Sequence, residues 1–434
     1  MEKTTPGRTG LPILGETPAF AKDSFAFVSQ RHREHGAVFI TNVLFRKTYV
    51  LVGPEAAAAF SDPANVARAG SLPPNVARLF SVGAVNQLDG EEHRRRKGHI
   101  MAAMTPGALA DYLPGLRRLM REAVARWNGA GQVVLQPELK LLTARIAAEN
   151  LMGVQEEALA AQLVELVEAT GAAFGGVPFP LPGTALRRAL SIQRVVFARY
   201  EALANARRQS PGKDGLSRMM SSEIEGERLE ARWAIGELHH MVLAGFITWS
   251  VFADGLVRLT QEPELLARLK AAAEALPDEP GPRAYVEAPG LAHFADELKR
   301  TSKVVPIIFG MAQRDFEVEG HTIPQGAAVL LGIYSGHNDP AAPYDAPETF
   351  DPDRFAEGRA EHKRHPAAFH PQGAGSIIEG HKCAGFDYSS LMIQVFFAEL
   401  LRGAPFSVPP QDLSRNMALI PPDYIGGLKV HFGQ

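Results

Sequence analysis

Residues 369–401 read FHPQGAGSIIEGHKCAGFDYSSLMIQVFFAELL and contain the only cysteine of the 434-residue chain, Cys383. The residues before Cys383 are rich in glycine and irregular, and the residues after it have the periodicity of an amphipathic helix. The thiol is therefore expected near a helix N-terminus, where free backbone amides and the helix dipole favour an anion and suit a thiolate ligand. The loop glycines permit left-handed backbone and close approach to a flat ligand; they are Gly373, Gly375, Gly380 and Gly385.

A single cysteine cannot form an internal disulfide or a cysteine-rich zinc site. Cys383 is therefore an inert buried thiol, a reactive thiol or an axial ligand to a metal. An isolated cysteine is more often inert, so the choice depends on the motifs elsewhere in the chain.

The composition is that of an ordinary globular protein, with 46% hydrophobic and 21% charged residues. Lys and Arg number 45 against 48 Asp and Glu, which gives a formal net charge of −3. This balance lacks the basic character that nucleic-acid binders usually have. The N-terminus has no signal-peptide pattern, and no apolar run reaches the roughly 18 residues of a membrane span. We therefore expect a cytoplasmic protein without a membrane span and without a nucleic-acid partner.

The periodicity predicts a mainly α protein with small β-sheets. The runs AVFITNVLF and TYVLVGP indicate two strands that pair as a hairpin. The stretch Glu227–Leu276 is apolar through its middle, as expected for a central helix buried on all sides, and Pro263 fits the start of the next helix. Other helices are expected over residues 91–104, 113–127, 154–174 and 185–208 and after Gly385, with strands within residues 315–334. No linker or repeat divides the chain, so we predict a single domain over residues 1–434.

Three motifs, taken together and in their order along the chain, resemble those of the cytochrome P450 superfamily, in particular its soluble bacterial members. The residues GHKCAG at 380–385 are similar to the Gly-x-(Arg/His)-x-Cys-x-Gly loop, although the first Gly is shifted by one residue. Upstream, ADELKR supplies Glu297 and Arg300 of a Glu-x-x-Arg helix, and FDPDRF supplies Arg354. The segments TGLPILGE, HTIPQGAAV and HND at 337–339 also look like the family, so the resemblance covers nearly the whole chain.

The resemblance implies a cytochrome P450-like fold, with a long central helix over a haem b group and Cys383 as the axial ligand. Glu297, Arg300 and Arg354 would form a charged cluster that braces the cysteine loop. The residues implied to hold the haem are His93, Lys97 and His381 at the propionates, with Gly380 and Gly385 in the loop. The strand position that often supplies a further propionate Arg falls near Met311, and Arg314 is the substitute that the sequence offers.

The central helix departs from the family pattern. Monooxygenases of the family carry Ala-Gly-x-(Asp/Glu)-Thr, in which the acid and the Thr deliver protons to bound dioxygen. The direct register keeps Thr248 as a catalytic residue and replaces the acid by Ile247; a register one residue earlier places Phe246 and Ile247 at these two sites. Either register lacks the acid, which weakens proton delivery. The predicted apolar substrate pocket comprises Ala244, Gly245, Phe246, Ile247 and Trp249.

The cysteine loop departs as well, because Ser376 and Glu379 stand where the common spacing has Phe and Gly. The longer form resembles the fatty-acid peroxygenase branch, which uses hydrogen peroxide without a redox partner. That branch holds a substrate carboxylate with Arg-Pro in the central helix, and this chain has Ala244-Gly245 or Leu243-Ala244 there. A simple fatty-acid peroxygenase is therefore not expected.

These features favour a haem-thiolate monooxygenase that oxidises an apolar small molecule of terpenoid, polyketide or fatty-acyl type. Its electrons would come from ferredoxin and ferredoxin reductase, or from no partner if peroxide is the oxidant. The alternatives are a peroxide-driven or non-oxidative enzyme, such as a peroxygenase, a hydroperoxide-rearranging enzyme, an isomerase or a dehydratase, and a haem-binding sensor or carrier without turnover. The adjacent His239 and His240 point about 100° apart on a helix, so they are expected in helix packing or pocket lining rather than at a second metal.

Overall fold

The computed structural model describes residues 4–433, which divide into two units, each assembled from two stretches of the chain. Residues 4–98 and 305–383 form the first unit, and residues 99–304 and 384–433 form the second. Helix α5 (Gly90–Ala102) passes from the first unit into the second. Because each unit is discontinuous in sequence, no linker marks a boundary, and the single domain over residues 1–434 stays a prediction.

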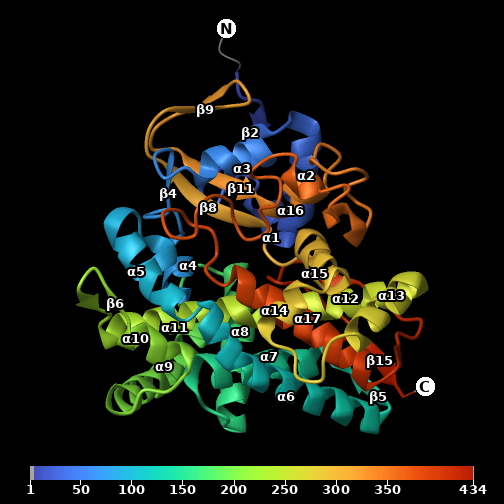
Figure 1. Ribbon diagram of the computed structural model, residues 1–434. Coiled ribbons are helices and arrows are strands. Elements are labelled where there is room, and N and C mark those ends of the chain that lie inside the picture. The colour runs from blue at the N-terminus through green and yellow to red at the C-terminus, as the bar shows by residue number, and fades with distance from the viewer. Residues whose placement is uncertain (1–3, 434) are drawn as a thin grey trace. The chain divides into compact units, whose positions relative to one another are not determined.

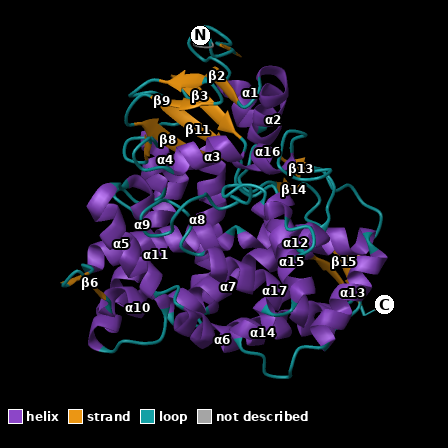
Figure 2. Cartoon of the chain, turned by 45° about the horizontal axis from the view of Figure 1, so that its top comes forward, coloured by secondary structure: helices purple, strands orange, loops and turns teal. Residues whose placement is uncertain are grey.

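The first unit is built on a six-stranded sheet of order β1-β2-β3-β11-β8-β4, drawn as arrows in Figures 1 and 2. The predicted hairpin is confirmed, because β2 (Val38–Val43) and β3 (Arg46–Val52) pair antiparallel. Strand β11 pairs parallel with β3 and antiparallel with β8. The remaining strands of this unit are β1 (Gly7–Arg8), β4 (Val66–Ala67), β8 (Ile307–Ala312) and β11 (Ala328–Gly332) in the sheet, and β9 (Phe316–Val318) and β10 (His321–Ile323) in a separate hairpin.

Short helices complete the first unit. Helix α2 begins after Asp23, whose side chain accepts a hydrogen bond from the Ala26 amide, and it ends at Gly36, whose φ of 91° favours glycine. It is joined to α16 by a buried hydrogen bond of 2.7 Å between His32 Nδ1 and Asp339 Oδ2. The helices are α1 (Thr17–Lys22), α2 (Ser24–His35), α3 (Pro54–Ser61), α4 (Pro74–Leu79) and α16 (Ile333–Asn338), with 3-10 turns at Val85–Gln87, Pro352–Phe355 and Glu361–Lys363.

The second unit is mainly helical (Figure 2). Its long helices follow the predicted periodic segments, and α7 packs against α6, α8, α11 and α12. The helices are α6 (Pro106–Ala130), α7 (Leu135–Met152), α8 (Glu157–Phe174), α9 (Ala185–Gln209), α10 (Gly215–Ser221), α11 (Ala231–Phe246), α12 (Thr248–Gln261), α13 (Pro263–Glu274), α14 (Pro282–Val286), α15 (Pro289–Thr301) and α17 (Phe386–Gly403). Short strand pairs are added by β5 (Gln132–Val134), β6 (Glu223–Ile224), β7 (Glu227–Arg228), β12 (Phe406–Ser407), β13 (Arg415–Asn416), β14 (Asp423–Tyr424) and β15 (Lys429–Phe432).

The predicted central helix is present as α11 and α12, which are separated only at Ile247, and a new helix begins at Pro263 as expected. The polar start of this stretch is not helical, because Glu227 and Arg228 form a strand that pairs with β6, and α11 begins at Ala231. Within residues 4–433, Ala231–Gln261 is the stretch with the length and composition of a membrane span, but 72% of its apolar window is buried inside the protein. Core helices of globular proteins commonly have this profile.

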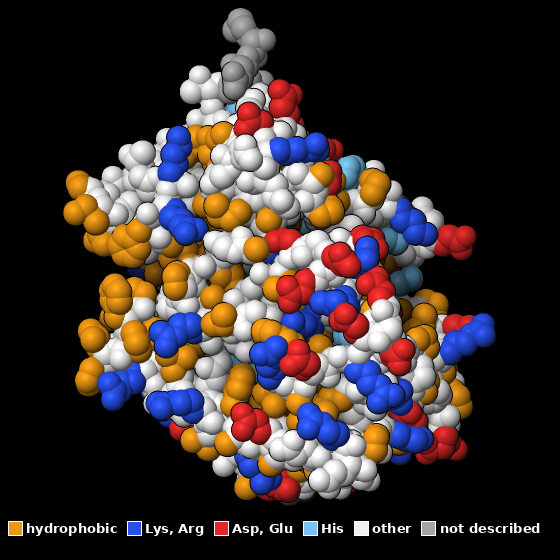
Figure 3. All heavy atoms as spheres, turned by 90° about the vertical axis from the view of Figure 1, so that its left-hand side faces the viewer, with side chains coloured by type: hydrophobic (Ala, Val, Ile, Leu, Met, Phe, Trp, Pro, Cys, Tyr) orange, Lys and Arg blue, Asp and Glu red, His pale blue; other side chains and the backbone are white. Residues whose placement is uncertain are grey.

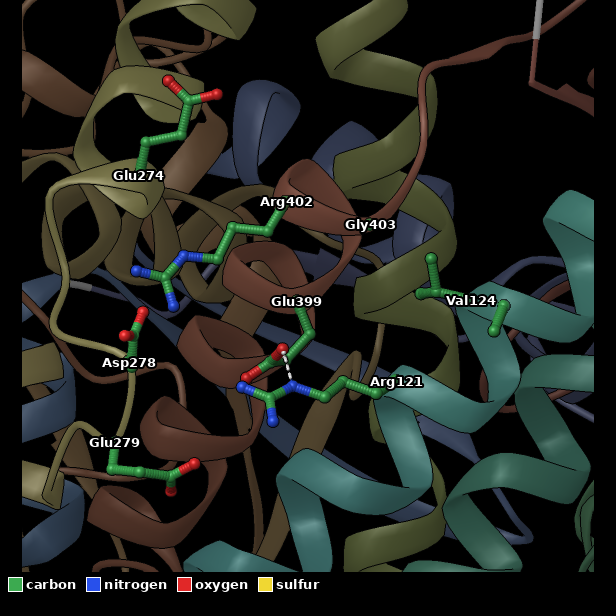
Figure 4. Close-up of a pocket in the computed structure, with 9 residues that line it drawn as sticks. Arg121, Val124, Glu274, Asp278, Glu279, Glu399, Arg402 and Gly403 are labelled. Carbon is green, nitrogen blue, oxygen red and sulfur yellow. Dashed lines mark hydrogen bonds and ion pairs between the residues drawn. The ribbon is translucent and has the colours of Figure 1, made fainter.

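Helix α17, which follows the cysteine loop, is held firmly within the second unit. The rings of Phe252 on α12 and Phe396 on α17 stack with centroids 4.1 Å apart. Gly255 allows this close packing, because a Cβ there would overlap the ring of Phe397. One turn further along α17, Arg117 and Arg121 of α6 bind opposite oxygens of the buried Glu399, at 2.9 and 2.6 Å; the Arg121 bond is dashed in Figure 4. The C-terminal half of the helix is therefore fixed.

The fold confirms the mainly α class with small sheets. On the face shown in Figure 3, acidic and basic side chains are interspersed, in agreement with the near balance of charges in the sequence. A polar cleft on the second unit is lined by Arg121, Glu274, Asp278, Glu279, Glu399 and Arg402 (Figure 4). It contains none of the predicted site residues, and its ion pairs serve the anchoring of α17.

Candidate functional site

The loop that carries Cys383 is fixed by its own backbone. The Cys383 amide donates to the Gln372 carbonyl over 3.0 Å, so the residues around Cys383 lie beside the glycine-rich residues before it. Gly373 and Gly375 have φ values of 86° and 78°, which confirms the expectation that these loop glycines adopt a left-handed backbone. Gly380 has a different reason to be glycine, because a Cβ there would lie 2.8 Å from the Ser376 carbonyl oxygen.

The thiol itself is free and half-buried, three residues before α17 begins at Phe386. Gly385 has an ordinary φ of −85° and forms the N-cap of that helix, so left-handed backbone is not its role. The expected placement of the cysteine just ahead of a helix is confirmed. A cysteine on a rigid loop, accessible and next to a helix N-terminus, is suited to act as a ligand.

Beside this loop, the first unit contains a cluster of buried charged and aromatic groups. The rings of His93 on α5 and His381 in the loop lie 4.1 Å apart. His381 Nε2 is 3.0 Å from Asp89 Oδ1, and Asp89 also accepts hydrogen bonds from the amides of Arg68 and Ala69. The Arg68 guanidinium is buried and donates to the Phe309 carbonyl. The structure thus brings the predicted His93 and His381 together.

Burial and mutual repulsion shape the ionisation of this cluster. Burial, then the nearby His381 and Lys97, lowers the pKa of His93 to about 3, so its ring is neutral at neutral pH. Burial also lowers the pKa of Arg68 to about 10, which still leaves it charged. Burial raises the pKa of Asp89, but hydrogen bonds from His381 and from the amides of Ala69 and Arg68 outweigh this and lower it overall. Asp89 is therefore an anion that balances only part of the positive charge.

The composition of the cluster fits a bound dianion. Arg68 and Lys97 supply two buried cations, and Asp89 is the carboxylate bonded within the cluster. Burial lowers the pKa of His381, so its ring takes part as a hydrogen-bonding group rather than as a third cation. His93 Nε2 is buried and has no hydrogen-bond partner among the described residues, a costly state that a ligand oxygen would relieve. A haem has two propionates and an iron that accepts a thiolate, so these residues and Cys383 together match its polar requirements.

A His93→Phe variant isolates the hydrogen bond proposed for His93. It keeps a ring stacked on His381 but removes Nε2, so we expect haem to be lost about tenfold faster, in line with one hydrogen bond to a charged group. Haem transfer to an excess of apo-globin measures this rate without reference to activity. His321→Phe, on β10, is the matched control and should leave the rate unchanged; an unchanged rate in His93→Phe would remove His93 from the site.

The three residues of the predicted bracing cluster belong to two buried ion pairs, one in each unit. Glu297 and Arg300 on α15 form a bidentate pair with N···O distances of 2.7 and 2.8 Å. In the first unit, Arg354 donates to Glu361 over 2.8 Å and to the Thr349 carbonyl over 2.9 Å. The joining of all three predicted residues in one cluster stays a prediction, and Glu361 is a partner that the sequence motifs did not identify.

A further bracing contact comes from Lys299, which also was not predicted. Its Nζ donates to the Phe386 carbonyl over 2.8 Å and to Ser390 Oγ over 2.6 Å, and it lies 3.8 Å from the centre of the Phe386 ring. The helix that contains Glu297 and Arg300 is therefore attached to the first turn of α17, directly after the cysteine loop.

On the central helix the predicted pocket residues divide into two groups. Ala244 is exposed and Gly245 and Ile247 are partly exposed, although the helix is otherwise largely buried. Phe246 and Trp249 are 2% and 1% exposed, and Lys140 of α7 places its Nζ 5.1 Å from the centre of the Trp249 ring. Burial against a neighbouring helix favours a core role for these two aromatic residues. Thr248 is buried at the first position of α12.

Two further expectations concern side chains away from this helix face. His239 packs against Phe197 of α9, with ring centroids 5.0 Å apart, and its Nε2 is 3.1 Å from Gln193 Nε2, as expected for helix packing.

Arg314 is not available as a substitute propionate ligand, because its Nε and Nη2 both bind Asn65 Oδ1, at 3.0 and 2.9 Å. Arg68 is instead the buried Arg beside His93 and His381.

The helical fold and the loop around Cys383 point to the class of haem-thiolate oxidoreductases. The family model for cytochrome P450 matches residues 5–420, and the chain belongs to this family. It is 26% identical to cytochrome P450 26A1 of Gallus gallus, over 93% of this chain and 85% of that protein. It is also 26% identical to a putative cytochrome P450 120 of Synechocystis, over 96% and 93% of the two chains.

Solved structures agree with this assignment. Cyanobacterial CYP120A1 with bound retinoic acid has a TM-score of 0.90 at 24% identity, with 100% of this chain and 99% of that one covered. A variant of cytochrome P450SP alpha (CYP152B1) has a TM-score of 0.80 at 26% identity, with 96% and 99% covered. Ligand-free cytochrome P450 OleT has a TM-score of 0.83 at 23% identity, with 98% of each chain covered. The fold is therefore that of a cytochrome P450, and the family implies a haem cofactor.

Proposed function

We propose that this protein is a haem b monooxygenase in which Cys383 is the axial thiolate ligand and an apolar small molecule is the substrate. The observation that carries the proposal is the single cysteine on a rigid loop just ahead of α17, in the same unit as the buried cluster of Arg68, His93 and His381. His93, Lys97 and His381 would hold the propionates, together with Arg68, and Gly380 would let the loop turn tightly. When bound, a haem with a thiolate ligand supplies oxidation chemistry that favours cleavage of an O–O bond.

The substrate would lie against the exposed side of the central helix. Ala244, Gly245 and Ile247 present small or apolar surface there and contribute no acid, base or metal ligand. This surface fits a molecule of terpenoid, polyketide or fatty-acyl type, held by burial of apolar area rather than by hydrogen bonds. Retinoic acid, bound to CYP120A1, and myristic acid, bound to a CYP152N1 structure, are the probes we would use first. We place the enzyme in the cytoplasm.

Which oxidant the enzyme can use depends on the side chains that can deliver protons. Thr248 has a hydroxyl that can pass a proton, but no carboxylate stands within Ala244–Trp249 to resupply it. With dioxygen as oxidant, two electrons from a ferredoxin-type partner and two protons are needed, and this supply would be slow. A second candidate is therefore a peroxide-driven enzyme, which the long glycine-rich cysteine loop favours, since hydrogen peroxide brings its own protons and electrons.

The two candidates are separated by one comparison of turnover. The purified holoenzyme is incubated with retinoic acid or myristic acid and with ferredoxin, reductase and NAD(P)H, with hydrogen peroxide, or with neither. The monooxygenase proposal expects slow formation of product in the first arm and none in the other two, and the second candidate expects product in the peroxide arm. Product without any oxidant would contradict both, and binding of substrate without turnover in any arm would indicate a sensor or carrier.

An Ile247→Glu variant tests whether the missing acid limits oxygen activation. Ile247 has helical φ and ψ of −59° and −13° and is partly exposed, so a carboxylate can be placed there without breaking the helix. We expect the fraction of NAD(P)H electrons recovered in product to rise up to about tenfold, part of the roughly 10²–10⁴ that a well-positioned acid–base group contributes. Ile247→Gln has the same shape without an ionisable group and should give no rise. Equal effects of the two variants would contradict the proton-delivery argument.

A further inference from the structure

Two buried histidines of the first unit have no role in the proposed site. His337, on α16, and His370, at the start of the loop that leads to Cys383, are each 0% exposed. The centroids of their rings lie 4.1 Å apart. Gly336 makes room for the His370 ring, because a Cβ there would lie 2.8 Å from His370 Nε2. Burial of an imidazole costs free energy unless hydrogen bonds compensate, so the partners of the ring nitrogens show what each ring does.

Both ring nitrogens of His337 are hydrogen-bonded to backbone. Its Nδ1 lies 2.7 Å from the Ile333 carbonyl oxygen, and its Nε2 accepts a hydrogen bond of 2.9 Å from the backbone amide of His370. Because a carbonyl only accepts and an amide only donates, Nδ1 carries the proton and Nε2 is the acceptor. Only the neutral ring in this tautomer can make both bonds. The His337 ring therefore connects α16 to the backbone of the loop that leads to Cys383.

Helix α16 supports this ring through its own buried contacts. It has only six residues, and a helix of that length is not stable without tertiary partners. Ser335 Oγ lies 2.8 Å from Ser29 Oγ, and Asp339, directly after the helix, is bonded to His32. Both contacts join α16 to α2. The residues on either side of His337 in the chain thus fix the position of its ring.

The connection continues along the backbone from His370 to Cys383. The Gly373 amide donates to the His370 carbonyl over 3.1 Å, and the Cys383 amide donates to the Gln372 carbonyl over 3.0 Å. Gly373 also packs closely on the residues before the cysteine, because a Cβ there would lie 3.5 Å from the His381 carbonyl oxygen. A movement of the backbone at His370 would therefore be passed to the backbone at Cys383.

The ring of His370 makes a different contribution. Its Nδ1 lies 2.7 Å from the Ala367 carbonyl oxygen, whereas its Nε2 is buried and has no hydrogen-bond partner among residues 4–433. Burial lowers the pKa of His370 to about 4, so the ring is neutral at neutral pH. His337 binds the backbone amide of His370, which every residue except proline would supply. The His370 ring is therefore dispensable for the bond to His337.

We propose that His337 is a positioning residue for the axial ligand: it binds the His370 amide, fixes the start of the loop and thereby keeps the Cys383 sulfur in place for the haem iron. The inference rests on the proposed function, in which Cys383 is the ligand of a haem. Without the acceptor at Nε2, the buried amide of His370 would lack a partner, and movement of the loop would relieve this costly state. The sulfur would then leave the iron more readily.

The test compares two substitutions of His337 in the holoenzyme. The side chain introduced by His337→Gln can place its oxygen near the position of Nε2 and accept from the His370 amide, whereas the shorter side chain of His337→Asn cannot reach it. The measurement is the rate at which the reduced, carbon-monoxide-bound protein loses the red-shifted Soret band of thiolate ligation. We expect this rate to rise at least about tenfold in His337→Asn, as for one lost hydrogen bond at a buried amide, and to stay within about twofold of the wild type in His337→Gln.

His370→Phe is the matched control. It removes both ring nitrogens and the bond to Ala367 but keeps the amide that His337 binds, so the band should be lost at the wild-type rate. The inference is overturned if His337→Asn keeps the band as long as the wild type, or if His337→Gln or His370→Phe loses it as fast as His337→Asn. A wild type without the band would contradict the proposed function itself, whereas a persistent band in His337→Asn would contradict only this inference.

A measurement on the wild-type holoenzyme covers the case in which His337→Asn does not fold. If one series of hydrogen bonds joins α16 to the cysteine, the amides of His370, Gly373 and Cys383 should exchange with deuterium slowly and at similar rates. Fast exchange at His370 together with protection at Cys383 would show that the two amides are independent and would overturn the inference.

Discussion

A Cys383→Ser variant should lose turnover with every oxidant, by at least about a thousandfold, which corresponds to about 4 kcal/mol of transition-state stabilisation. A serine hydroxyl is not ionised at neutral pH, so the iron would lose the anionic ligand whose electron density favours O–O cleavage. Haem should still be retained in part, because His93, His381 and Arg68 are unchanged. Turnover per bound haem, with reductase partners and with peroxide, is the measurement.

The control for this variant lies in the same loop. Ser376 Oγ accepts a hydrogen bond from the Glu379 amide at 3.1 Å but is not a ligand in the proposed site. Ser376→Ala should therefore keep turnover close to that of the wild type. If Cys383→Ser retained wild-type turnover per haem, Cys383 would not be the axial ligand, and the proposed function would lose its basis.

The second large effect is expected on stability, in a Glu297→Ala variant. Glu297 and Arg300 are 0% and 1% exposed, so the variant leaves a buried guanidinium without its carboxylate partner. Removing one partner of a buried ion pair costs about 3–5 kcal/mol. We expect a large shift of the urea midpoint to lower concentration, followed by circular dichroism of the holoenzyme, together with faster loss of haem.

An exposed pair with similar sequence spacing provides the comparison. Arg283 and Glu287 on α14 are paired at 2.5 Å, with 87% and 56% of their side chains exposed. Glu287→Ala should cost no more than about 1 kcal/mol, since solvent screens such pairs. Equal midpoints for Glu297→Ala and Glu287→Ala would show that burial does not give the Glu297 pair its importance.

The parts of the fold that were predictable are those with strong local signals. The hairpin at Val38–Val52 follows from β-branched runs separated by a short turn, and the break before Pro263 follows from helix-start chemistry. Helices α8 and α9 match the predicted ranges closely, because their apolar residues recur with helical spacing.

Other elements depend on tertiary partners or on signals that were overlooked. The two-residue strands β1 and β4 exist because β2 and β8 offer them partners, and no local pattern reveals such strands. Helix α6 begins at Pro106, not near Leu113 as predicted, because Thr105 caps it by accepting a hydrogen bond from the Ala108 amide. The pair Thr105-Pro106 is a recognisable start signal that could have placed this boundary.

The residues of the candidate site also divide into those that the sequence motifs predict and those that only the fold brings together. Cys383, His93 and His381 could be found because each stands at a fixed spacing within a motif. Arg68 and Asp89 could not, because they join His381 through the fold from positions about 300 residues away in sequence. Asp89 had one weak signal, since it stands four residues before His93, one helical turn away.

The most direct test of the central claim, that Cys383 binds haem iron as a thiolate, is the absorption spectrum of the reduced, carbon-monoxide-bound protein. The account predicts the red-shifted Soret band that gives the cytochrome P450 family its name in the freshly purified wild type, and its absence in Cys383→Ser. A wild-type spectrum without that band, or the same band in Cys383→Ser, would contradict the assignment of the axial ligand.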